Sequence, residues 1–191
     1  MITRDDDHRY WVETPNGVVN YPGVSEILKD VGFSSSKINW NPHKTQLGTD
    51  VHKYCEDLDR GLKPDIPDEA KGYVRAYKKW LKEMNVKILE VELFINNDDF
   101  EYAGQLDRVA IVNGVKSIVD LKTGVEAKLH GVQLNAYAFA YEQSHEDKTP
   151  LTRAGLYLRE TGKYKYKTYN DPADLQDFLA ACRVFHRKKK L

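Results

Sequence analysis

Asp107 and Asp120, with Lys122 two residues further on, are the strongest candidates for chemistry in this sequence. Asn113-Gly114 separates two strand-like runs within residues 100–123. Such a dipeptide between hydrophobic runs predicts a type I′ hairpin turn, because both of its residues adopt positive φ. The pairing that follows from a two-residue turn places Asp107 directly opposite Asp120.

The alternation of strand side chains sets the surroundings of these two acids. In this register Leu106 faces Leu121, and one face of the hairpin carries Gln105, Asp107, Val109, Ile118, Asp120 and Lys122. Like charges about 5 Å apart destabilise a sheet, so a shared proton, the lysine or a divalent metal must offset the repulsion. The alternative is an edge hairpin with both acids in water, but the apolar run from Val115 to Leu121 favours a buried strand.

These groups suit the hydrolysis of a phosphate ester. Two carboxylates can hold a hard cation, and an ammonium beside them can orient a water for attack on phosphorus. His52, four residues after Gly48 on an expected helix, could complete the metal's ligands, although a lone helical histidine is more often a packing residue. Gln133 and Tyr137 share one helix face and either reach the site or form the polar edge of a core helix.

The elements that must position these residues can be followed along the chain. We expect a hairpin over His8 to Val19 and a short helix from Pro22 to Gly32. Loops are expected at Ser34-Ser35-Ser36 and at Trp40-Asn41-Pro42. Two further helices are expected, over Gly48 to Gly61 and from Asp65 to Asn85. Further expectations are a strand from Ile88 to Ile95, the central hairpin, a helix from Ala127 to Gln143, strands over Ala154 to Arg159 and Tyr164 to Tyr169, and a last helix after Asp171-Pro172. This order predicts an α/β fold on a mixed central sheet flanked by helices.

Composition limits the class of protein. A chain of 191 residues with 41% hydrophobic and 30% charged residues suits one soluble domain with a core, divided into residues 1–47, 48–170 and 171–191. The polar N-terminus and the lack of long apolar runs predict a cytoplasmic protein with no membrane partner. Two cysteines cannot bind an iron–sulfur cluster through four thiolates. The net charge of zero means that any nucleic-acid partner needs a local basic patch.

Five elements in this order resemble the PD-(D/E)XK nuclease superfamily, most closely its RecB-like exonuclease branch, which includes phage exonucleases and the mitochondrial genome maintenance exonuclease. The elements are Gly48-x-x-x-His52, Glu92, Gly104-x-x-Asp107, Asp120-Leu121-Lys122-Thr123-Gly124 and Gln133-x-x-x-Tyr137. The similarity spans about half of the chain, from Gly48 to Tyr141, and implies a restriction-endonuclease-like core. The second acid is an aspartate where many members have glutamate, a change that is frequent in this branch.

The resemblance implies a DNase that depends on one or two Mg²⁺ or Mn²⁺ ions. Its ligands would be His52, Asp107, Asp120 and the Leu121 carbonyl, and Lys122 would position the attacking water. Glu92 matches a less regular acidic position that could bind a second metal or activate water. In the same comparison Gln133, Tyr137 and Thr123 serve to position DNA.

A second surface is a candidate for DNA contact. Lys163, Lys165 and Lys167 alternate with tyrosines and share one strand face, so they could grip phosphates, or they could protect a sheet edge from aggregation. The basic C-terminal run after His186 could add salt-sensitive affinity.

We therefore expect a metal-dependent DNA exonuclease that acts on ends or single strands in replication, recombination or repair, of the kind found in a phage or its bacterial host. A recombinase, a single-strand-binding protein or a helicase is a candidate partner. The alternatives are a structure-specific endonuclease on the same core and an inactive adaptor that binds DNA. Metal binding at this site would argue against the inactive adaptor. Cutting of closed circular DNA would identify an endonuclease rather than an exonuclease.

Overall fold

The computed structural model describes residues 1–33, 41–145 and 149–191. A small antiparallel sheet at the N-terminus contains β1 (Ile2–Arg4), β2 (Tyr10–Thr14) and β3 (Gly17–Tyr21). The helix α1 (Val24–Asp30) follows it. The expected hairpin and short helix are therefore confirmed, whereas β1 is an addition that the sequence did not suggest. The predicted loop at Ser34-Ser35-Ser36 lies outside the described residues.

A five-stranded mixed sheet forms the centre of the described chain, in the order β4-β5-β6-β7-β8. Its strands are β4 (Lys87–Asn97), β5 (Tyr102–Val112), β6 (Val115–Lys122), β7 (Thr152–Leu158) and β8 (Tyr164–Thr168). β6 and β7 are parallel, and the other neighbours are antiparallel. A parallel pair needs a crossover, which α4 (Leu129–Ser144) provides.

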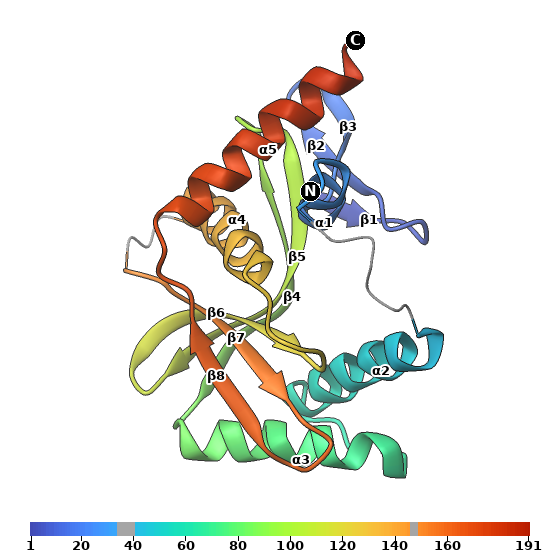
Figure 1. Ribbon diagram of the computed structural model, residues 1–191, viewed down its shortest axis with the longest axis vertical. Helices are drawn as coiled ribbons and strands as arrows, with labels where there is room; N and C mark the ends of the chain where they lie inside the picture. The colour runs from blue at the N-terminus through green and yellow to red at the C-terminus, as the bar shows by residue number, and fades with distance from the viewer. Residues whose placement is uncertain (34–40, 146–148) are drawn as a thin grey trace.

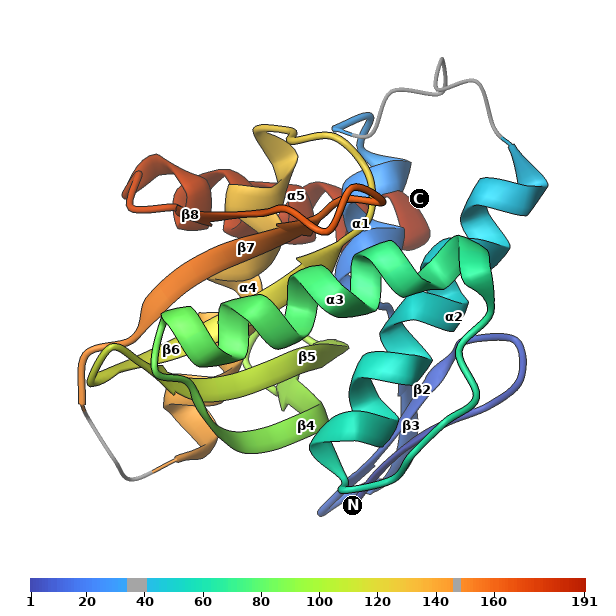
Figure 2. The same cartoon turned by 90° about the horizontal axis from the view of Figure 1, so that it is seen from below.

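Helices cover both faces of this sheet, as Figures 1 and 2 show. On one face α1, α4 and α5 (Ala173–Lys189) share a core with Ile95, Leu106, Val109 and Ile118. On the other face α2 (Pro42–Asp59) and α3 (Asp68–Glu83) pack on Val119, Leu121, Leu156 and Leu158. The predicted α/β fold with a mixed sheet between helices is confirmed.

The Asn-Gly turn forms as expected. Asn113 has φ of 48° and Gly114 has φ of 83°, as a type I′ turn requires. The predicted register holds from Val112 opposite Val115 down to Arg108 opposite Val119. This turn therefore fixes which residues of β5 and β6 meet.

Below Arg108 the expected pairing changes. Leu106 packs in the same cluster as Val109, although strict alternation puts these two residues on opposite faces, and Leu121 packs in the other cluster. The predicted contact between Leu106 and Leu121 is therefore wrong. The cause is a break in the alternation of β5 near Asp107, where the paired residues of β5 and β6 end.

The helix α2 begins earlier than expected. Asn41 is its N-cap, with its side chain accepting a hydrogen bond from the Lys44 backbone N–H at 3.2 Å, and Pro42 is the first helical residue. We expected a break at Asn41-Pro42 and a helix from Gly48. The expectation was wrong because an Asx–Pro pair also starts a helix, and the longer helix carries Lys44 and Thr45 along the site described next.

Candidate active site

The site lies where β5 and β6 stop pairing. One oxygen of Asp107, Oδ2, accepts a hydrogen bond from the Leu121 backbone N–H at 2.6 Å. In a sheet, a backbone carbonyl of the neighbouring strand is the usual acceptor for such an N–H. Its other oxygen lies 3.5 Å from His52 Nδ1. Both side chains are mostly buried, with exposed fractions of 12% for Asp107 and 31% for His52.

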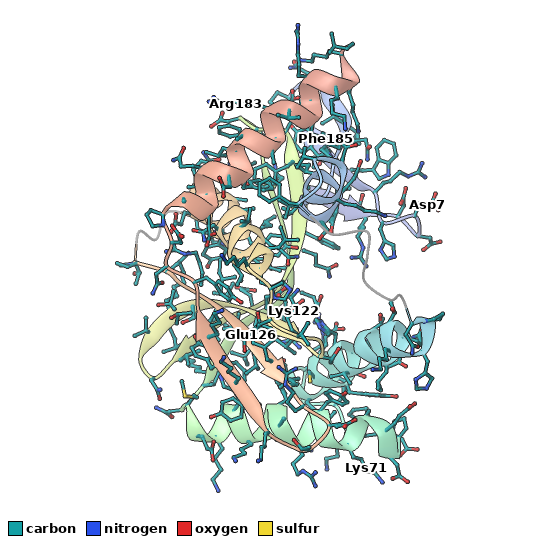
Figure 3. All side chains as sticks on the ribbon, viewed as in Figure 1. Asp7, Lys71, Lys122, Glu126, Arg183 and Phe185 are labelled. Carbon is teal, nitrogen blue, oxygen red and sulfur yellow. The ribbon has the colours of Figure 1, made fainter. Side chains whose placement is uncertain are left out.

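Asp120 and Lys122 form the second part of the site. The Lys122 ammonium lies 2.6 Å from Asp120 Oδ2, and the two residues are neighbours on one face of β6. The same ammonium donates to Gln133 Oε1 at 3.3 Å, and the Gln133 amide nitrogen donates to the Tyr137 hydroxyl at 3.0 Å. Figure 3 shows Lys122 in the interior of the molecular outline, between α4 and α2. Gln133 and Tyr137 thus hold the lysine from α4.

The carboxylates and the histidine influence one another's protonation. Burial alone would raise the pKa of Asp107, but the charges of His52, Lys122 and Arg108 bring it down to about 2. Burial raises the pKa of Asp120 despite the nearby Lys122 ammonium, and the Asp107 charge adds to this. Burial lowers the pKa of His52, but the Asp107 carboxylate more than compensates and the net shift is upward. Environments that separate the pKa values of two carboxylates are common at catalytic sites.

A group of possible metal ligands is present among the described residues. His52, Glu92 and Asp107 each offer a ligand atom, and these atoms lie within 4.8 Å of one another. Burial, and then the Asp107 charge, raise the pKa of Glu92, so the charged form of this carboxylate is disfavoured. A divalent cation would offset this charge, and a set rich in carboxylates suits Mg²⁺ or Mn²⁺. The residues present therefore fit a divalent metal.

The predicted site residues are placed as follows. His52, Glu92 and Asp107 come together from α2, β4 and β5, and Asp120 with Lys122 lies beside them on β6. Thr123 lines the same hollow as Asp107. Lys163 is exposed, Lys165 forms an ion pair with Glu126 at 2.6 Å, and neither lysine lines that hollow.

Two glycines of the sequence pattern have steric explanations. A Cβ on Gly48 would lie 3.0 Å from Thr123 Oγ1, so this glycine lets α2 approach the end of β6. A Cβ on Gly104 would lie 2.6 Å from Tyr137 Cε1, so this glycine lets the tyrosine ring lie against β5. Both close contacts bring a helix that carries a site residue towards the sheet.

A hollow of about 630 Å³ opens over Asp107. His52, Glu92 and Tyr137 line it, as do Arg4, His8 and Tyr10 of the N-terminal sheet region and Lys44 of α2. A second hollow of about 770 Å³ shares Lys44 and Thr123 with the first and continues between α2, α3 and the start of the β6–α4 connection. The two hollows meet beside Thr123, the residue that follows Lys122.

Sequence reasoning missed two buried residues of the site, Arg108 and Asp59. Their side chains are 0% and 2% exposed and are joined by a 2.6 Å contact from Arg108 Nε to Asp59 Oδ2. Arg108 also donates to Glu92 Oε1 at 3.0 Å. The clue available in the sequence was Arg108 itself, a charged residue inside the apolar run after Asp107. Its partner Asp59, on α2, is 49 residues away in sequence.

Comparison with known families decides the class of protein. The model of the PD-(D/E)XK nuclease superfamily matches residues 60–188. The chain belongs to this superfamily. Membership implies a metal-dependent nuclease, in agreement with the ligand group and the lysine. The matched residues begin after His52, so the place of this histidine rests on the geometry at Asp107.

Other comparisons add little beyond this family. None of the curated proteins compared with the chain matches it. A solved structure from Eubacterium rectale, described provisionally as an exonuclease, is 15% identical, with a TM-score of 0.49 over 85% of this chain and 71% of its own. The solved structure of SSO0001 is 16% identical, with a TM-score of 0.35 over 84% of this chain and 81% of its own. In the described part of the chain, no helix combines the length and apolar character that crossing a membrane requires.

Proposed function

We propose that the protein is a Mg²⁺- or Mn²⁺-dependent deoxyribonuclease of the RecB-like exonuclease branch, which hydrolyses phosphodiester bonds at DNA ends or in single strands. The observation that carries the proposal is the approach of the His52, Glu92 and Asp107 ligand atoms within 4.8 Å, in a hollow that is also lined by Thr123, the residue after Lys122. A binding adaptor has no need of this arrangement.

His52, Asp107, Asp120 and the Leu121 carbonyl are the proposed ligands. Glu92 is added because its ligand atom lies within 4.8 Å of those of His52 and Asp107, whereas Asp120 lies outside this group, paired with Lys122. When bound, a divalent ion would supply Lewis-acid polarisation of the phosphate and of a water. Lys122 donates a hydrogen bond to the attacking water and is kept in place by Asp120 and Gln133. Asp107 is held in its orientation by the Leu121 N–H, so it needs no rearrangement to bind metal.

The hollow supplies groups that bind a nucleic-acid strand. Arg4 and Lys44 line it from opposite elements, and neither side chain has an ion-pair partner among the residues that the structure describes. Free cations beside a tyrosine, here Tyr10, are the usual combination for holding phosphates and stacking a base. Thr123 lies where the two hollows meet, which suits a strand that continues from one into the other. Lys163, directly before β8, and Lys165 on β8 would give a more distant contact.

The test compares end-labelled linear DNA with covalently closed circular DNA in Mg²⁺, in Mn²⁺ and in EDTA. We expect degradation of linear DNA in either metal, none in EDTA, and intact closed circles. Cutting of closed circles would replace the exonuclease proposal with an endonuclease. Binding of DNA without cleavage of any substrate in either metal would support an adaptor instead.

A further inference from the structure

Arg108 is a buried cation beside the proposed metal ligands. It follows Asp107 in β5, and its side chain has no exposed surface. It lies on the α2 and α3 face of the sheet, where Tyr77 is also fully buried. Arginine is almost never fully buried unless it is paired, because a charge without partners is costly to remove from water. The identity of its partners therefore indicates what it does.

The partners come from three elements. Arg108 Nε lies 2.6 Å from Asp59 Oδ2 on α2. Its Nη1 donates to Glu92 Oε1 on β4 at 3.0 Å and to the Asp107 backbone carbonyl at 2.7 Å. Asp59 is the last residue of α2, the helix that carries His52. One guanidinium thus contacts each of the three elements that supply the ligand group.

Glu92 needs this support. Its φ is 53°, a left-handed conformation that is strained for a residue other than glycine. It lies between Val91, which pairs with Arg108, and Leu93, which pairs with Leu106, shortly after the irregularity of this ladder between Ile88 and Glu90. Strained residues persist only where the surrounding structure holds them, and they concentrate at functional sites.

We propose that Arg108 is a positioning residue that holds Glu92 as a metal ligand through a single oxygen. Its hydrogen bond occupies Oε1 and leaves Oε2 for the ion, while its contact with Asp59 holds the guanidinium itself in place. This inference rests on the proposed metal-dependent function. The competing view is that Arg108 only anchors α2 to the sheet through Asp59, and that its contact with Glu92 has no effect on metal binding.

A double-mutant cycle separates the two views. Mn²⁺ affinity is measured by titration calorimetry, without DNA, for the wild type, Arg108→Lys, Glu92→Gln and the double variant. We expect Arg108→Lys to weaken Mn²⁺ binding about tenfold or more, because a lysine cannot contact Asp59 and Glu92 together. In the Glu92→Gln background the same change should have little further effect. An equal loss in both backgrounds, or no loss in either, would overturn the proposal.

Tyr77→Phe is the matched control. It removes the hydroxyl that donates to Asp59 at 2.7 Å and accepts from Arg108 Nε at 3.4 Å, but it does not touch Arg108 Nη1, which donates to Glu92. Its thermal stability should fall while its Mn²⁺ affinity stays the same. A fall in Mn²⁺ affinity equal to that of Arg108→Lys would show that loosening α2 is enough, which contradicts the specific role of the Glu92 contact.

If Arg108→Lys does not fold, a second variant tests the same proposal. Asp59→Asn keeps Arg108 and removes the charge that anchors it, so we expect weaker Mn²⁺ binding, an effect that largely disappears in the Glu92→Gln background, and a changed visible absorption spectrum of bound Co²⁺. Unchanged affinity together with an unchanged spectrum would reject the proposal. If the wild type did not bind Mn²⁺, the metal site itself would be contradicted. This result differs from one in which the wild type binds Mn²⁺ but Arg108 has no effect on the affinity.

Discussion

At the scale of residues, Lys122 and Asp107 are each held by two contacts. Lys122 is paired with Asp120 and also bound by Gln133, and Asp107 faces His52 while it accepts the Leu121 N–H. Groups fixed in this way need little reorganisation when charge develops in a transition state. The sequence indicated the two acids and the lysine, but the pairing predicted from the two-residue turn holds only as far as Arg108 opposite Val119 and does not reach Asp107 and Asp120.

Behind the lysine, His130 predicts a specific pH dependence of stability. Its Nδ1 lies 2.6 Å from the Tyr157 hydroxyl, and Tyr157 pairs with Lys122 between β7 and β6. Burial, together with the Lys122 and Lys167 charges, lowers the pKa of His130 to about 4. The unfolded chain binds this proton near pH 6.5. The neutral His130 ring therefore makes its full contribution to folding stability above pH 6.5, and this contribution is lost as the pH falls towards 4.

Urea unfolding at pH 7 and at pH 4.5 measures this effect in the wild type and in His130→Gln. We expect the variant to lose less stability on acidification, by about 1 kcal/mol once screening by water is allowed for. His8→Gln, at an exposed histidine, should keep the wild-type pH dependence. Identical pH dependence in His130→Gln and the wild type would contradict the neutral state of His130 in the folded protein.

At the scale of elements, close packing between α4 and β5 holds Tyr137 and Gln133 at the site. Gly104→Ala places a methyl group 2.6 Å from Tyr137 Cε1, so the ring or the strand must shift. We expect a loss of stability of about 1–3 kcal/mol, together with slower DNA cleavage, because the same ring contacts Gln133. Chemical denaturation and cleavage rates measure the two effects.

Gly124→Ala is the control for this prediction, since a Cβ there meets no atom within 4 Å. It should leave the stability close to that of the wild type. If Gly104→Ala were as stable as Gly124→Ala and as active as the wild type, the close approach of Tyr137 to β5 would have no role in the site.

The elements also show how far the sequence could predict the fold. The hairpin, its register near the turn and the helix pattern depend on local rules, and they were predicted correctly from Asn113-Gly114 and from apolar spacing. The break in β5 near Asp107 and the contact of Arg108 with Asp59 depend on residues far apart in the chain. Local patterns carry no information about such contacts, so Arg108 became apparent only in three dimensions.

At the scale of the whole molecule, the N-terminal sheet and α2 form two walls of the hollow over Asp107. A net charge of zero gives no general attraction to DNA, so binding must depend on local cations. Arg4 and Lys44 have no ion-pair partner in the part of the chain that the structure describes. By contrast, Arg9 is paired with Asp5 and Asp7, and Lys71 with Asp68.

This difference predicts which cations bind DNA. The double variant Arg4→Ala/Lys44→Ala should bind a labelled oligonucleotide more weakly in EDTA, and its affinity should depend less on salt, with a log–log slope reduced by about 1.5 to 2. Fluorescence anisotropy over a range of salt concentrations measures both quantities. Arg9→Ala/Lys71→Ala is the matched control and should change neither. Equal effects of the two double variants would show that the hollow is not the binding surface.

The central claim is that Asp107 and Asp120 hold a divalent ion beside Lys122 and that this arrangement cleaves DNA. The most direct test is the rate of degradation of end-labelled linear DNA by the wild type and by Asp120→Asn, as Mn²⁺ is added to protein first treated with EDTA. We predict no cleavage before Mn²⁺, a rate that saturates with Mn²⁺ in the wild type, and a rate lower by about 100-fold or more in Asp120→Asn, with DNA binding retained. Cleavage in EDTA, or an Asp120→Asn rate equal to the wild type, would contradict it.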